Sequence, residues 1–269
     1  MAINITSLPC VSYAMPALAS WPKPRYTGRI MPALPTAILF DLDDTIIQAY
    51  AKPEEAWWRL LERFRGELPD DADRFARMHR AILEEGRTFW SDPVKAARWR
   101  LDLAGARRLV VRRALARLQL ADDVLADRIG DAFTELRRQE YKLFPDAHDT
   151  LDRLRAAGIK LALVTNGAAL TQRAKVVRFD LEHRFEHIQI EGEFGKGKPD
   201  PEVYIHVLGR LGVPPQACWM IGDNVEWEVV MPQRLGMRGI WYDPHGMGLP
   251  ADSTVRPDRI LTRLGELLE

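Results

Sequence analysis

After Pro145 the chain alternates between short apolar runs of strand type and amphipathic segments of helical type. Leu151 and Leu154 belong to a helix that Gly158 ends, and the run 159–164 is the strand that follows. Because parallel strands need long crossover connections, this alternation predicts an α/β fold: a doubly wound parallel sheet with helices on both faces. The same pattern predicts strands at 187–191, 217–221 and 238–242, and helices at about 168–178, from Pro201, at about 226–235 and at 258–268.

A long helical stretch separates the first strand from this alternating region. The apolar run 37–41 suits a buried parallel strand. From about residue 50 to 144 the apolar residues follow helical spacing, as in Val111, Leu115 and Leu118, and no β-rich run interrupts them. This predicts an α-helical domain inserted after the first strand. We therefore divide the chain into an extended or disordered arm (1–35), an α/β core (36–48 and 145–269) and a helical insert (49–144).

The N-terminal arm is expected to be poorly packed. Residues 1–40 contain no Asp or Glu, and six prolines fall within the first 35 residues. Each proline lacks a backbone donor and restricts the residue before it, which disfavours helices and central strands. A signal peptide fits poorly, because no positive residue precedes the apolar part. A true start at Met31 and an organelle-targeting segment are the alternatives.

Charge and hydropathy exclude several classes of partner. The 38 basic and 38 acidic residues cancel, which argues against binding a nucleic acid polymer through its phosphates. No apolar run reaches about 18 residues, so no membrane association is expected. Cys10 and Cys218 match no zinc or disulfide pattern, which fits a soluble protein of a reducing, cytoplasmic compartment. Both a monomer and a homodimer are compatible with the sequence.

Polar residues follow three of the predicted strands, at the edge of the sheet where ligands bind in open parallel sheets. Asp41 and Asp43 are two positions apart, so in an extended segment they point the same way. Carboxylates that close repel one another unless a cation or a proton separates them. The other groups expected at this edge are Thr165, Asn166 and Gly167 after the second strand, Lys198 before Pro199, and Asp223 after Gly222.

These donors predict a magnesium ion. The carboxylates of Asp41, Asp43 and Asp223 offer oxygen alone, and Mg²⁺ favours few carboxylates together with water and substrate phosphate. Zinc would require His or Cys, and neither occurs in these motifs.

The four motifs, in this order, resemble those of the haloacid dehalogenase (HAD) superfamily, and specifically its phosphatase branch. That family carries a D-x-D-x-T motif, a Ser or Thr after the second strand, a Lys before Pro and a late G-D pair. The matching residues here are 41–45, Thr165, Lys198 and 222–223, and the resemblance spans roughly residues 37–242. It implies a Rossmann-like core, and the helical insert corresponds to the cap domain that many members place after the first motif.

The resemblance also implies a role for each of these residues. Asp41 would be the nucleophile that forms an aspartyl-phosphate, and Asp43 would protonate the leaving group and then activate water. Thr165 would donate its hydroxyl to the phosphoryl oxygens, assisted by the backbone N–H groups of Asn166 and Gly167. Lys198 would balance the negative charge. Mg²⁺ would be held by Asp41, the backbone carbonyl of Asp43, and Asp223.

One position departs from the family pattern. Five residues after the last motif's Asp the family usually has a second Asp, and here that position is Glu228. A role at the site and an ordinary acidic residue at a helix start are equally open for Glu228, which we leave out of the metal ligands. The tryptophans of the insert are expected to be core residues, and Arg98 or Arg100 is a candidate to face an anionic substrate.

The sequence therefore predicts a Mg²⁺-dependent phosphomonoesterase of a small phosphorylated metabolite, with the insert closing over the site. A phosphosugar mutase of the same superfamily is the nearest alternative. Dehalogenation is disfavoured because it needs no acid at Asp43, and carbon–phosphorus cleavage because the insert holds few lysines. A non-catalytic protein that keeps the fold is disfavoured because Asp41 and Lys198 are intact.

Overall fold

The computed structural model describes residues 34–50, 52–68 and 72–269. The expected arm, together with Cys10 and Met31, lies almost entirely outside these residues. Within the described residues, no helix combines the length and the hydropathy needed to cross a lipid bilayer.

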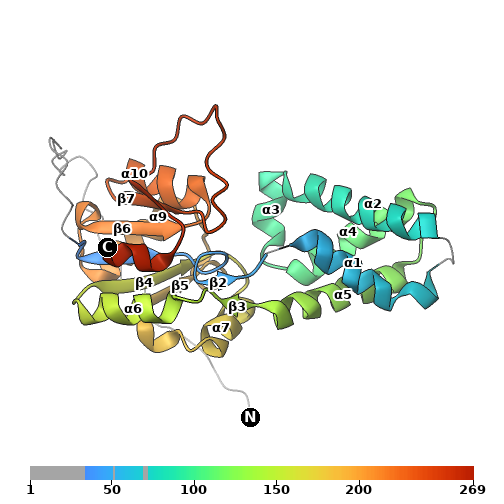
Figure 1. Cartoon of the computed structure of the whole chain (residues 1–269), viewed down its shortest axis with the longest axis horizontal. Coiled ribbons are helices and arrows are strands. Elements are labelled where there is room, and N and C mark those ends of the chain that lie inside the picture. Colours follow the sequence, from blue (N-terminus) through green and yellow to red (C-terminus); the bar gives the residue numbers. More distant parts are fainter. Residues whose placement is uncertain (1–33, 51, 69–71) are drawn as a thin grey trace, which may run out of the picture. The chain divides into compact units, whose positions relative to one another are not determined.

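Six strands form one sheet in the order β5-β4-β1-β6-β7-β8, and every neighbouring pair is parallel (Figure 1). The chain therefore has the predicted α/β fold with a doubly wound, Rossmann-like parallel sheet. The strands are β1 (Ala37–Phe40), β4 (Lys160–Thr165), β5 (His187–Ile190), β6 (Cys218–Gly222), β7 (Arg238–Tyr242) and β8 (Arg259–Leu261).

Both faces of the sheet are buried under helices. All four residues of β1 are inaccessible to solvent. Ile38 and Phe40 belong to one apolar cluster and Ala37 and Leu39 to another, because successive side chains of a strand point to opposite faces. The first cluster includes residues of α6 (Ala147–Ala156) and the second residues of α9 (Pro201–Leu211). The remaining core helices are α7 (Ala169–Arg178), α8 (Glu191–Phe194) and α10 (Met231–Arg234).

Capping residues mark the helix ends that the sequence predicted. Gly158 follows α6 with φ +80°, a left-handed conformation that costs glycine little. The helix α9 begins with Pro201 in its first turn, and the Asp200 side chain accepts a hydrogen bond of 2.9 Å from the Glu202 N–H.

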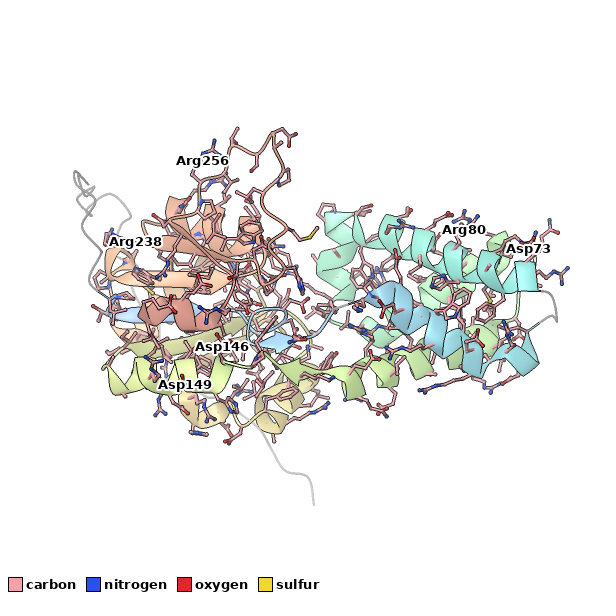
Figure 2. All side chains as sticks on the ribbon, in the orientation of Figure 1. Asp73, Arg80, Asp146, Asp149, Arg238 and Arg256 are labelled. Carbon is pink, nitrogen blue, oxygen red and sulfur yellow. The ribbon has the colours of Figure 1, made fainter. Side chains whose placement is uncertain are left out.

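Two predicted helices differ from the structure. Residues 258–268 are not one amphipathic helix: they form the edge strand β8 and a 3₁₀ helix, Leu264–Leu268. Leu261, Leu264 and Leu267 are buried. Their spacing of three residues resembles the apolar face of an amphipathic helix, which explains the wrong prediction. The unpaired edge of β7 offers backbone partners to β8, and Asp146 accepts a 2.8 Å hydrogen bond from the Gly265 N–H (Asp146 is labelled in Figure 2). The helix expected at 226–235 begins as a π-helix, Val225–Val230, and continues as α10.

Helices cover most of residues 53–140, and strand pairing joins the two ends of this segment. Strand β2 (Ile47–Gln48) pairs antiparallel with β3 (Lys142–Leu143), placing Ile47 opposite Leu143. The aspartates Asp92, Asp102 and Asp122 cap three helices by accepting N–H hydrogen bonds. The helices are α1 (Pro53–Arg63), α2 (Ala72–Trp90), α3 (Pro93–Trp99), α4 (Leu103–Arg117) and α5 (Asp123–Glu140), with a 3₁₀ turn at Arg65–Glu67.

The insert has its own apolar cluster, drawn from α1, α2, α4 and α5. Trp57 is buried in it and stacks on Phe133 with 3.5 Å between ring centroids, as expected of a core residue. The expectation is wrong for Trp58 and Trp90, which are 41% and 38% exposed.

Candidate active site

The predicted motifs meet at one edge of the sheet because β1 lies between β4 and β6. Phe40 lies between Leu163 of β4 and Ile221 of β6 in the sheet register. Asp41, the next residue, therefore leaves the sheet between the ends of β4 and β6. The Asp41 N–H donates to the Ile221 carbonyl at 2.9 Å. This bond extends the pairing with β6 by one residue beyond the end of β1.

The loop after Asp41 turns at Asp44. Its φ of +58° lies in the left-handed region, which Asp tolerates better than most residues. The Asp44 carboxylate accepts hydrogen bonds from the Ala49 N–H at 2.8 Å and the Tyr50 N–H at 3.1 Å. This local turn returns the chain toward the insert and leaves Asp41 at the sheet edge.

Asp41 is buried and bound to a lysine from a distant part of the chain. The Lys198 ammonium lies 2.5 Å from its Oδ1, and the Thr45 hydroxyl donates to Oδ2 at 3.2 Å. Burial raises the pKa of Asp41, and the attraction of Lys198 opposes that rise. The structure thus places Lys198 directly beside Asp41.

Glu228 is the second partner of Lys198. The side chain is fully buried, with its Oε1 2.8 Å from the Lys198 Nζ, and its Oε2 accepts a 2.8 Å hydrogen bond from the Asn224 N–H. Burial raises the pKa of Glu228 to about 7, although Lys198 lowers it. Burial alone would lower the pKa of Lys198, but Asp41 and Glu228 outweigh that effect and raise it. Glu228 is thus part of the charge cluster at the site.

Asn166 fixes the backbone that carries Lys198. Its side-chain amide donates to the Lys198 carbonyl and its Oδ1 accepts from the Lys198 N–H, both at 2.8 Å. The Gly167 N–H, expected to be available to a phosphate, donates instead to Glu191 Oε2 at 2.9 Å. Sequence reasoning did not single out Glu191, a buried acid that directly follows β5.

Asp43 lies in a separate network from Asp41. Both of its carboxylate oxygens lie 2.7 Å from the Lys175 Nζ, and Oδ2 also accepts from the Gln172 amide at 3.0 Å. Gln172 and Lys175 were missed by sequence reasoning. A signal for them existed: polar residues occupy the buried stripe of α7 alongside Val176, at positions where apolar residues are usual.

Asp223 borders a cavity of about 400 Å³ that is also lined by Asp44, Tyr50 and Trp241. Asp223 is solvent-exposed, but partial loss of hydration beside the cavity raises its pKa to about 8, and repulsion from Asp41 and Glu228 adds to the rise. The carboxyl groups of Asp41, Glu228 and Asp223 therefore outnumber the positive charge of Lys198, which pairs with the first two.

This donor set fits Mg²⁺. Among the described residues, no three His, Cys, Asp or Glu side chains converge as a ready metal cluster. The predicted ligands need none, because two carboxylates, those of Asp41 and Asp223, would share the ion with the Asp43 carbonyl and water. The excess negative charge and the raised pKa of Asp223 are what a divalent cation would relieve.

Arg100 of the insert contacts a buried acid of the core. The Arg100 guanidinium pairs with Glu191 through contacts of 2.6 to 2.9 Å and lies 5.5 Å from the Trp227 ring. Of the two arginines considered from the sequence, Arg100 thus reaches core residues at the site. Arg98 lies over the Trp99 ring of the insert itself.

Residues 35–236 match the family model described as haloacid dehalogenase-like hydrolase, and the chain belongs to that family. It is 39% identical over 145 residues to the phosphoserine phosphatase of Thermus thermophilus, a match that covers 54% of this chain and only 55% of that relative. It is 29% identical to the glyceraldehyde 3-phosphate phosphatase of Pyrococcus furiosus, over 86% of this chain and 91% of that one.

A solved structure shows the same fold. A candidate HAD-type hydrolase of Bacillus subtilis, bound to magnesium, superposes with a TM-score of 0.62 at 20% identity, covering 87% of this chain and 97% of that one. The family expected from the four motifs is confirmed by the match of residues 35–236 to the family model.

Proposed function

We propose that this chain is a Mg²⁺-dependent phosphatase of a small phosphorylated metabolite that works through an aspartyl-phosphate on Asp41. The observation that carries the proposal is the buried carboxylate of Asp41, held 2.5 Å from Lys198 at the end of the central strand. A carboxylate is a suitable nucleophile for phosphoryl transfer, and a lysine beside it can offset the charge of the arriving phosphate. The relatives named as phosphatases of phosphoserine and glyceraldehyde 3-phosphate support a small substrate.

The residues divide the reaction into two steps. In the first, an Asp41 oxygen attacks phosphorus, the ester P–O bond breaks, and the leaving oxygen takes a proton from Asp43. In the second, water attacks the phosphorus of the aspartyl-phosphate, Asp43 accepts a proton from that water, and phosphate leaves as the Asp41 carboxylate is restored. The Asp43 carboxyl group lies 2.7 Å from the Lys175 Nζ, a contact that holds the side chain in place.

Thr165 and Lys198 bind the phosphoryl group during both steps. Thr165 is 2% exposed, at the end of β4, and offers a hydroxyl. A Mg²⁺ ion bound by Asp41, the Asp43 carbonyl and Asp223 would neutralise phosphoryl charge and orient the group for attack. We further propose that the helical insert is a cap domain, with Arg100 at its contact with the core. Cytoplasmic localisation stays a prediction.

The test is phosphate release from a panel of phosphorylated metabolites, with and without Mg²⁺. The wild type should release phosphate only with Mg²⁺, and Asp41→Asn should be inactive. Asp149→Asn is the matched control, because Asp149 is an exposed aspartate of α6 (Figure 2). Turnover by Asp41→Asn would contradict the nucleophile assignment. Conversion of a sugar phosphate to its isomer without net phosphate release would favour the mutase alternative.

A further inference from the structure

Two buried polar residues of α7 are left without a role by the reaction just described. Gln172 and Lys175 are each 2% exposed. Ordering and burying a lysine and a glutamine is costly, so each must be satisfied by partners. Their partners include Asp43 and Thr165, two residues on which the proposed reaction depends.

Lys175 determines which way the Gln172 amide faces. Its ammonium has three donors and no acceptor. These donors have three partners: the two Asp43 oxygens at 2.7 Å and the Gln172 Oε1 at 2.8 Å. The Tyr141 ring lies over the same ammonium at 4.8 Å. Because an ammonium can only donate, the amide oxygen of Gln172 must face Lys175.

The amide nitrogen of Gln172 then faces the site. Its two hydrogens have two acceptors within reach: Asp43 Oδ2 at 3.0 Å and Thr165 Oγ1 at 2.6 Å. The Thr165 hydroxyl oxygen therefore accepts from Gln172 and cannot donate to it. The carbonyl of Asn166 is a poor alternative acceptor for the hydroxyl hydrogen, at 3.4 Å.

A phosphoryl oxygen is an acceptor, so Thr165 is useful to it only as a donor. We propose that Gln172, oriented by Lys175, is a positioning residue that fixes the Thr165 hydroxyl as a donor to the transferring phosphoryl group. The inference rests on the proposed phosphatase function and deepens it. Such a fixed donor needs no reorientation when charge develops in the transition state.

The experiment is a double-mutant cycle between Gln172 and Thr165. Wild type, Gln172→Leu, Thr165→Val and the double variant are compared for Mg²⁺-dependent hydrolysis of p-nitrophenyl phosphate. This ester has a leaving group that needs little protonation, so effects of Gln172 through the acid Asp43 contribute little. Gln139→Leu is the control, because Gln139 is an exposed glutamine of α5 whose side-chain amide donates to Glu135.

We expect Gln172→Leu alone to lower kcat by about tenfold or more, with a smaller change in KM. In the Thr165→Val background the same change should cost less than about twofold, because no hydroxyl remains to be oriented. Thr165→Ser, which restores a hydroxyl, should restore the dependence on Gln172. Circular dichroism of every variant checks the fold, and Gln172→Glu, which keeps the length but replaces the donor by an acceptor, is the second variant.

The outcomes distinguish the positioning role of Gln172 from the proposed phosphatase function. Equal losses from Gln172→Leu in both Thr165 backgrounds, with an active wild type, overturn the positioning role and leave the phosphatase function intact. Full activity of both Gln172→Leu and Gln172→Glu does the same. A wild type that hydrolyses no phosphate ester overturns the proposed function and this inference with it.

Discussion

Replacement of Lys198 by methionine tests the charge cluster most directly. The lysine is completely buried and lies 2.5 Å from Asp41 and 2.8 Å from Glu228. At an effective dielectric constant of about 20, each contact represents a gross attraction of about 6 to 7 kcal/mol. Burial of the three charges offsets most of that attraction, so the net cost of removing the lysine is the cost of leaving two buried carboxylates unpaired. Such a loss typically lowers the free energy of unfolding by about 3–5 kcal/mol.

The loss should depend on pH in a defined direction. Both carboxyl groups already have raised pKa values, about 7 for Glu228, and removing Lys198 removes the interaction that lowers them. An acid with a higher pKa in the folded state stabilises the fold only while protonated, so stability declines as pH rises above about 4 toward the folded-state pKa. Lys198→Met should therefore be least destabilised near pH 5 and most destabilised near pH 8.

The assay is urea unfolding at pH 5, 6.5 and 8, with EDTA present throughout. Lys196→Met is the matched control: Lys196 is 43% exposed and pairs with Glu202, so its loss should change the free energy of unfolding little at any pH. A Lys198→Met variant that loses the same free energy at all three pH values, or no more than Lys196→Met, would refute the reasoning.

Three further predictions follow from individual contacts. The affinity for Mg²⁺, measured by calorimetry, should rise with pH up to about 8, because Asp223 must lose its proton to bind the ion. An affinity that stays constant from pH 6 to 9 would contradict this expectation. Gly239→Ala should lower the free energy of unfolding by about 2 kcal/mol, because the new Cβ would lie 2.5 Å from the Val229 Cα. Gly209→Ala should instead raise the free energy of unfolding by about 0.5–1 kcal/mol, because its Cβ would enter open space on α9. Arg100→Ala should lower the free energy of unfolding by about 2 kcal/mol, because it removes charge-assisted hydrogen bonds to buried Glu191. An unchanged midpoint of urea unfolding would show that the pair contributes nothing.

The parts of the site that the sequence could predict are those fixed by the ends of strands. Apolar runs predict the strands β1 and β4. Parallel pairing of these two strands brings Asp41 and Thr165 to the same edge of the sheet and does not depend on how the side chains pack. The roles of these residues and of Asp43, Lys198, Asp223 and the magnesium ion stay predictions, since they depend on a bound substrate and ion.

The parts that could not be predicted depend on contacts between distant segments. Lys175 reads as one more charged residue of a helix until the fold places it against Asp43. Glu228 likewise reads as a favourable acid near a helix start, and only burial beside Lys198 gives it another role. The strand β8 was mistaken for a helix because one apolar spacing serves both a helix and a strand followed by a 3₁₀ turn. Pairing along the free edge of β7 decided between them.

The central place of β1 has a consequence for how the chain is made. Phe40 pairs with residue 163 on one side and with residue 221 on the other, so both neighbours are synthesised long after it. Pairings of such high contact order form slowly, whereas the intervening helices can form from local contacts. A fully apolar strand therefore keeps at least one unpaired edge until β6 leaves the ribosome. Nascent chains that stop short of residue 218 should be the aggregation-prone species of this protein, and a chaperone would find its binding segment at residues 37–40.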